Sequence, residues 1–167
     1  MLFRSEEAGL KVDNGIVVDG FGRTSDPNIR AVGDVTNHHN PLLDRSLRLE
    51  SGQHAQNHAI AVAKAICGHD APYAEIPWFW SDQYDVNFQI LGVPERWASA
   101  VLRGDLAARK FTLVYLDDEN RIVGMNAANG AQDIAVGRRL MARNAPLDPA
   151  VLADESLPLK RLLKASG

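Results

Sequence analysis

The sequence predicts a mixed fold in two parts, with α/β character in residues 1–74 and α+β character in residues 75–167. Three observations support this. In the first part, short apolar segments precede one long stretch of helical periodicity, residues 51–67. In the second part, apolar segments with a period of two precede a further helical pattern. A proline-bounded linker, residues 71–77, separates the two patterns and marks the expected boundary.

The first part is expected to open with a β-hairpin. Residues 9–19 place apolar side chains on both sides of Asn14-Gly15, a pair that suits a type I′ turn because both central residues need a positive φ. Residues 28–34 predict a short buried strand that ends in Gly-Asp. Residues 35–48 show no clean period, so we expect a loop there.

The clearest helix follows this loop. Ser51 is a suitable N-cap, and Gly68 occupies the position at which a left-handed residue commonly ends a helix. The expected buried face is a stripe of mostly small apolar residues: Ala55, Ala59, Val62, Ala63 and Ile66.

The second part is expected to form an antiparallel sheet with covering helices. The expected strands cover residues 85–91, 98–103, 111–116 and 121–127. The acidic turn 117–120 joins the last two strands as a hairpin. The expected helices cover residues 132–143, a short segment capped by Asp148 ahead of Pro149, and residues 156–164.

Composition excludes several classes of protein. With 18 Lys and Arg against 21 Asp and Glu, the chain lacks the basic footprint of a nucleic-acid binder. No apolar run approaches the roughly 20 residues of a membrane helix, and the first residues lack the apolar core of a secretory signal. Cys67 is the only cysteine, which excludes an internal disulfide and a cysteine-based zinc site. A cytoplasmic protein is the expectation.

Several potential chemical motifs have simpler structural explanations. Gly20-Phe21-Gly22 begins like a dinucleotide-binding turn, but a third glycine is missing and Pro27 blocks a following helix. We therefore interpret it as a plain turn. Cys67 fits a small buried hydrophobe without a redox role. Turn and surface roles explain the two carboxylate pairs, Asp82 with Asp85 and Asp117 with Asp118.

Four histidines could cluster: His38, His39, His54 and His58. His54 and His58 lie one helical turn apart, a spacing that can bind zinc. No glutamate follows His54, so the metalloprotease motif is absent. Polar histidines on a loop and a helix are the favoured interpretation, and a metal site remains an alternative.

Two further patterns are compatible with ligand binding. For the first, periodicity alone favours a strand-end turn followed by an ordinary helix, and for the second a core plug between the two parts is the alternative. A strand that ends at Asp34 would place a carboxylate at the carboxyl edge of a sheet, where ligands of α/β folds collect. The helix that begins near Ser51 would offer backbone donors and a partial positive charge to an anionic ligand atom. The second pattern is the aromatic run in residues 77–83. Alternation would put Trp78 and Trp80 on one face, where a Trp could cover a planar ligand.

Together these motifs resemble the FAD-dependent ferredoxin reductases of the putidaredoxin and rhodocoxin reductase type. The matching segments are residues 24–34 (TSDPNIRAVGD), 48–51 (RLES), 55–57 (AQN), 77–83 (PWFWSDQ), 133–140 (DIAVGRRL) and 152–160 (LADESLPLK). The resemblance covers only the end of such a protein, because this sequence contains neither the Gly-rich turn for FAD nor that for the nicotinamide cofactor. It implies a partial FAD-domain layer followed by the C-terminal reductase domain. We expect a truncated product or one subunit of a split enzyme, which would need the missing domains or a complementary subunit.

The resemblance also implies residue roles. Asp34 would bind the FAD ribityl chain, Val35 would lie near it or the pyrophosphate, and Trp80 would screen the flavin ring. The residues around the helix start would lie near the flavin or the nicotinamide: Glu50, Ser51, Gly52 and Gln53. Many relatives carry a larger residue where this sequence has Gly52, and an Asn where it has His54.

The implied reaction passes electrons from NAD(P)H through FAD to an iron–sulfur ferredoxin. The cofactor carries this chemistry, so no acid–base catalytic residue and no metal ligand are expected in this chain. The residues that distinguish NADH from NADPH would lie outside it. The alternative is a non-catalytic module of the same fold that acts in dimerisation or partner docking. Apolar surface left uncovered in the first part also predicts a homo-oligomer.

Overall fold

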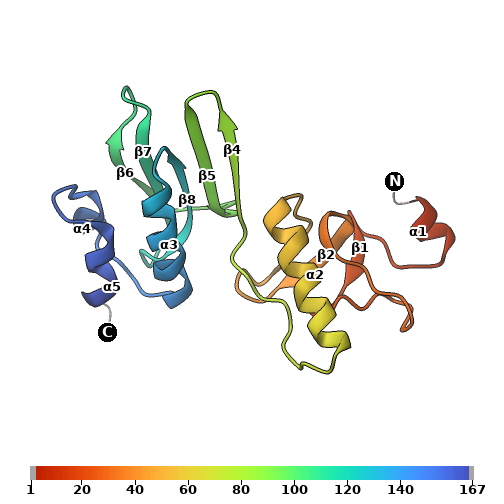
Figure 1. Cartoon of the computed structure of the whole chain (residues 1–167). Coiled ribbons are helices and arrows are strands. Elements are labelled where there is room, and N and C mark those ends of the chain that lie inside the picture. The colour runs from red at the N-terminus through yellow and green to blue at the C-terminus, as the bar shows by residue number, and fades with distance from the viewer. Residues whose placement is uncertain (1–2, 166–167) are drawn as a thin grey trace. The chain divides into compact units, whose positions relative to one another are not determined.

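The computed structural model describes residues 3–165, which form two compact units that divide after Pro77 (Figure 1). The elements of the first unit are α1 (Phe3–Glu7), β1 (Ile16–Val18), the 3₁₀ turn η1 (Gly33–Val35), β2 (Thr36–Asn40), β3 (Arg45–Leu47) and α2 (Gly52–Ile66). Those of the second are β4 (Trp78–Gln83), β5 (Val86–Gly92), β6 (Ser99–Asp105), β7 (Lys110–Leu116), β8 (Ile122–Ala128), α3 (Ala131–Arg143), α4 (Pro149–Ala153), η2 (Leu159–Arg161) and α5 (Leu162–Ala165).

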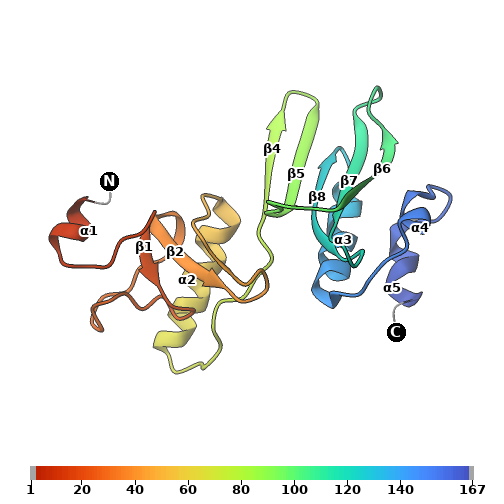
Figure 2. The same ribbon diagram turned by 180° about the vertical axis from the view of Figure 1, so that it is seen from behind.

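The first unit is a small mixed sheet with α2 on one face (Figures 1 and 2). The strand order is β1-β2-β3, with β1 parallel and β3 antiparallel to β2. The hairpin expected at Asn14-Gly15 consists of little more than its turn. A single bridge joins Val12 to Ile16, and β1 pairs with β2 instead of extending the hairpin. Both turn residues do have positive φ, 46° and 144°.

Two expectations for residues 28–48 are wrong. Residues 28–34 form no strand; they contribute one bridge, from Arg30 to Arg23, and run into η1. The expected loop contains β2 and β3 instead. Hydrophobic periodicity cannot detect β2, because its buried side chains are polar. The Thr36 hydroxyl donates to Gly33 O and the Asn40 amide donates to Glu75 O, so these two are satisfied inside the unit.

Helix α2 begins and ends as expected. The Ser51 hydroxyl accepts a hydrogen bond from the His54 amide over 3.3 Å, and Gly68 has a φ of 90° beyond the last turn. Of the expected apolar stripe, however, only Val62 is buried. His54, His58 and Val62 face the sheet, whereas Ile66 is 64% exposed. The buried face of α2 therefore lies on the side of the helix that carries His54 and His58, whose rings pack in the interior as aromatic groups.

The interpretation of Gly20-Phe21-Gly22 as a turn is confirmed. Asp19 Oδ1 accepts hydrogen bonds from the amides of Phe21 and Arg23, each over 2.9 Å. Gly22 has a φ of 69°, and an added Cβ would lie 2.6 Å from Val62 Cγ2. This glycine lets the turn approach α2 closely.

The second unit is a five-stranded antiparallel sheet of order β4-β5-β8-β7-β6, which can be followed from behind in Figure 2. Strands β5 to β8, α3 and the cap of α4 by Asp148 confirm the expected elements. The fold class is likewise confirmed. Helix α3 packs against β5 and β8 through Ile134, Gly137 and Leu140. Strand β4 is an additional edge strand formed by the aromatic run.

None of the helices in residues 3–165 is both long and apolar enough to cross a membrane.

Candidate functional site

Asp34 lies in the turn η1, immediately before β2. Because β1 runs parallel to β2 and Ile16 pairs with Thr36, this turn is at the amino edge of the strand pair. The expectation of a carboxylate at the carboxyl edge is therefore wrong. The side chain is nonetheless exposed, and no hydrogen bond to its carboxylate forms within residues 3–165. It is thus available to a ligand, while the neighbouring Val35 is half-buried.

Arg48 joins this turn to the start of α2. Its Nε donates to the backbone oxygen of Asp34 over 3.1 Å, and its Nη2 forms an ion pair of 2.8 Å with Glu50. The structure therefore brings Asp34 and Glu50 into one local network. Sequence reasoning assigned no role to Arg48, because its importance depends on both partners being in place.

The first turn of α2 leaves donors free. Ser51 caps the His54 amide, but within the described residues the amides of Gly52 and Gln53 donate to no acceptor. Gly52 is exposed, and no atom lies within 4 Å of the position a Cβ would take. The helix start thus combines unpaired N–H groups, the positive end of the helix dipole and open space.

Trp80 lies on β4 in the second unit, where the strand places it on the same face as Trp78, as alternation predicts. The two indole rings stack with centroids 4.9 Å apart. Trp78 is anchored by a hydrogen bond from Nε1 to Gln89 Oε1 of 3.1 Å, whereas Trp80 is 47% exposed. The outer indole therefore presents a flat apolar face on a fixed support.

The histidines are not the polar surface groups favoured from sequence. His38, His54 and His58 are buried together with Tyr73, and their ring centroids lie 4.8–5.5 Å apart. Burial lowers the pKa of His38 and of His58 to about 4 and also lowers the pKa of His54. His39 is exposed beside Asp44 and does not join them. Among the described residues, no three His, Cys, Asp or Glu side chains are arranged to hold a metal ion.

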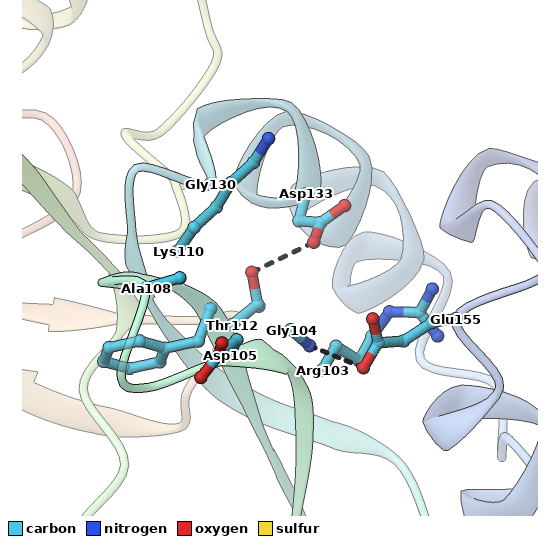
Figure 3. Close-up of a pocket in the computed structure, with 10 residues that line it drawn as sticks. Arg103, Gly104, Asp105, Ala108, Lys110, Thr112, Gly130, Asp133 and Glu155 are labelled. Atoms are coloured by element: carbon cyan, nitrogen blue, oxygen red, sulfur yellow. Dashed lines mark hydrogen bonds between the residues drawn. The ribbon is translucent and has the colours of Figure 1, made fainter.

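A separate pocket of about 400 Å³ lies in the second unit, between the β6–β7 hairpin and the start of α3 (Figure 3). Thr112 Oγ1 donates to Asp133 Oδ2 over 3.0 Å, and the Gly104 amide donates to Glu155 Oε1 over 2.9 Å. Figure 3 shows the Lys110 side chain extending past these groups. Sequence reasoning did not select the residues that line this pocket. The carboxylates of Asp133 and Glu155 already accept hydrogen bonds from the protein itself.

Two family models divide the chain much as the structure does. Residues 1–59 match the pyridine nucleotide-disulphide oxidoreductases, and residues 78–163 match the reductase C-terminal domain. The chain therefore contains the reductase C-terminal domain, preceded by a segment similar to the pyridine nucleotide-disulphide oxidoreductases. More specifically, it belongs to the ferredoxin reductase family and carries that family's C-terminal reductase domain. The family match implies FAD and NAD(P)H as the cofactors of the family. The predicted family is thereby confirmed.

Named relatives agree with this assignment. The ferredoxin–NAD(+) reductase component of the anthranilate 1,2-dioxygenase system from Burkholderia cepacia is 48% identical over 95% of this chain and 39% of its own length. Putidaredoxin reductase from Pseudomonas putida is 37% identical over 95% of this chain and 37% of its own length. The chain thus spans well under half of the relatives it matches.

Solved structures give the same picture. The covalent putidaredoxin reductase–putidaredoxin complex matches 99% of this chain and 39% of the solved chain, with a TM-score of 0.91 and 37% identity. The ferredoxin reductase of the CYP199A2 system from Rhodopseudomonas palustris matches 99% of this chain and 40% of its own, with a TM-score of 0.90 and 34% identity.

Proposed function

We propose that this chain is the C-terminal part of an FAD-dependent ferredoxin–NAD(P)+ reductase, which passes electrons from NAD(P)H through FAD to an iron–sulfur ferredoxin. The observation that carries the proposal is the open start of α2, with Asp34 joined to it through Arg48. When bound, FAD supplies the conversion of a two-electron donor into one-electron steps. The residues of this chain contribute binding and orientation.

The α2 start fits the electron-rich edge of a flavin. The free amides of Gly52 and Gln53 would donate to it, and the helix dipole would stabilise negative charge there. The absence of a side chain at Gly52 keeps this approach open. Ser51 keeps the first turn intact by capping it.

Asp34 fits a polyhydroxyl chain. An exposed carboxylate without a partner can accept two or more hydrogen bonds from ligand hydroxyls, as the ribityl group of FAD offers. Val35 follows it in the same turn and would lie along the same part of the cofactor. Glu50 is held by Arg48 and would face the nicotinamide side.

Trp80 fits a planar ring. We assign it to the flavin, because it offers an exposed indole face backed by Trp78. It would shield the ring from water rather than take part in proton transfer. No residue of this chain is assigned as an acid or a base.

A chimeric enzyme tests the proposal directly. This chain would replace the matching C-terminal 39% of the Burkholderia cepacia reductase component, which is 48% identical to it. We expect the chimera to purify with bound FAD and to reduce that system's ferredoxin with NADH. A chimera that folds but takes up no flavin would overturn the proposal and favour a dimerisation or docking module.

A further inference from the structure

The interior of the first unit is a cluster of four rings drawn from three segments. His38 comes from β2, His54 and His58 come from successive turns of α2, and Tyr73 comes from the segment after α2. Their exposed fractions are only 0–5%. His38 stacks on His54 at 5.0 Å and 12°, and His58 stacks on Tyr73 at 4.8 Å and 26°. These contacts hold α2 against the sheet.

The ring nitrogens of this cluster are only partly satisfied. His54 Nδ1 lies 3.2 Å from the Tyr73 hydroxyl, and His58 Nδ1 accepts the Gly33 amide over 3.3 Å. Within the described residues, both nitrogens of His38 and the Nε2 atoms of His54 and His58 have no partner. A buried imidazolium would need acceptors at both nitrogens, and this interior offers none to His38.

Stacking prevents His38 and His54 from forming a hydrogen bond with each other. An N–H bond lies in the plane of its imidazole, so a ring stacked on a neighbour directs its hydrogen past that neighbour's nitrogens. The parallel pair of His38 and His54 is therefore well packed only while both rings are neutral.

The charged groups around the cluster do not compensate. Burial lowers the pKa of His54, and this effect outweighs three that raise it: a hydrogen bond with the Gly33 backbone, then the charges of Asp34 in η1 and Glu75 after α2. His39 on β2 adds repulsion at His38, and a charge on His54 opposes protonation of both His38 and His58. Each proton that enters thus makes the next one harder to accommodate in the closed unit.

We propose that this cluster is a proton-sensitive lock, which holds α2 on the sheet while its rings are neutral and releases α2 when they are protonated. The lock depends only on this chain and not on the function proposed above.

Linkage gives the direction and the pH window. An unfolded histidine titrates near 6.5, whereas His38 and His58 in the closed unit titrate at a pKa of about 4. Between these values the open form binds more protons, so the closed form loses stability as the pH falls from about 6.5 toward 4. At pH 5 the closed-to-open ratio falls roughly thirtyfold for each of these two rings, relative to pH 7.5.

The chain contains its own control for the experiment. All five histidines lie before Pro77, and all three tryptophans lie after it. Amide hydrogen exchange of the full chain, corrected for the intrinsic pH dependence of exchange, would follow α2 from pH 7.5 to 4.5. Tryptophan emission and exchange in β7 and β8 would monitor the second unit at the same time.

We expect α2 to lose protection by at least about thirtyfold between pH 7.5 and 5, while the second unit is unchanged. H38F keeps a planar ring without a titrating nitrogen. In this variant the loss of α2 protection between pH 7.5 and 5 should be smaller by a factor of roughly thirty. H39N alters an exposed histidine whose repulsion is the smallest of those acting on His38, so it should change the profile far less than H38F. If H38F does not fold, the imidazole NMR signals of the unsubstituted chain serve instead: His38 and His58 should not titrate above pH 5. Constant α2 protection down to pH 4.5, or equal effects of H38F and H39N, would overturn the proposal.

Discussion

The Nε of Arg48 donates a hydrogen bond of 3.1 Å to the backbone oxygen of Asp34. This bond connects the turn before β2 to the segment that leads into α2. The bond uses the backbone of Asp34 and leaves its carboxylate free for a ligand. The guanidinium has further donors for Glu50. The Arg48 side chain thereby links two residues of the proposed cofactor site, Asp34 and Glu50.

Asp34→Ala in the chimeric reductase should weaken FAD binding more than it slows flavin reduction. A hydrogen bond to a charged acceptor contributes about 1.5–3 kcal/mol, or roughly one to two powers of ten in the dissociation constant. The measurements are the FAD dissociation constant and the flavin reduction rate at saturating FAD. Asp44→Ala removes another exposed carboxylate of the first unit and should change neither.

Trp80→Ala should slow flavin reduction more than it weakens FAD binding. An indole beside the ring affects how nicotinamide and flavin meet, so the reduction rate should fall more than FAD affinity. Trp97 is a matched control, because it is 51% exposed and also packs against an aromatic ring, that of Tyr115, with the two rings tilted by 49°. Equal effects of Trp80→Ala on affinity and rate, or equal effects of the two tryptophan variants, would contradict the assignment of Trp80.

The chain alone should not retain FAD. Asp34 and the α2 start supply only a few hydrogen bonds, each contributing about 0.5–3 kcal/mol, and the sequence contains no Gly-rich pyrophosphate turn. Dialysis of purified chain after incubation with FAD, followed by an absorption spectrum, checks this. A yellow protein after exhaustive dialysis would show that the binding determinants have been underestimated.

Ser51→Ala should loosen the first turn of α2. Loss of an N-cap costs about 0.5–2 kcal/mol, so amide exchange of α2 should accelerate by about twofold to thirtyfold at neutral pH. Ser46→Ala changes an exposed serine of β3 and should have little effect. Unaltered exchange in α2 would mean that packing of the helix, rather than its cap, holds the first turn.

The chain should associate weakly through the outer face of α2. Ile60 and Ile66 are 46% and 64% exposed on this helix, which places apolar surface in water. Light scattering across a concentration series should show a mass that rises with concentration, and an Ile60→Lys/Ile66→Lys double variant should remain monomeric. Leu106→Lys changes a residue in the second unit that is 55% exposed and serves as the control. A monomeric mass at every concentration would rule this out.

Sequence patterns predicted the second unit well, because strands such as β7 bury every second residue and α3 buries one apolar face. They failed for β2, whose inward side chains are polar; two of them, Asn37 and Asn40, depend on partners distant in sequence. The buried face of α2 was misassigned for the same reason. His54 and His58 are polar by any hydropathy measure, and only the rings of His38 and Tyr73 make their burial favourable.

The candidate site was only partly accessible to sequence reasoning. Ser51 and Gly68 have local signatures, so the limits of α2 could be predicted. The position of Asp34 depends on the parallel pairing of β1 with β2, which no local pattern encodes. The role of Arg48 depends on two contacts that form only in the folded unit.

The strand order of the second unit has a consequence for how fast it forms. In β4-β5-β8-β7-β6, three of the four neighbouring pairs are also consecutive in the chain, and only β5 and β8 meet across a longer segment. Short loops close at low entropic cost, so most of this sheet can assemble from local hairpins. In the first unit, β1 must instead find β2 in parallel across the intervening turn residues before α2 has a surface to cover. During synthesis the slower unit leaves the ribosome first, and this order gives it extra time before the quickly forming sheet is complete.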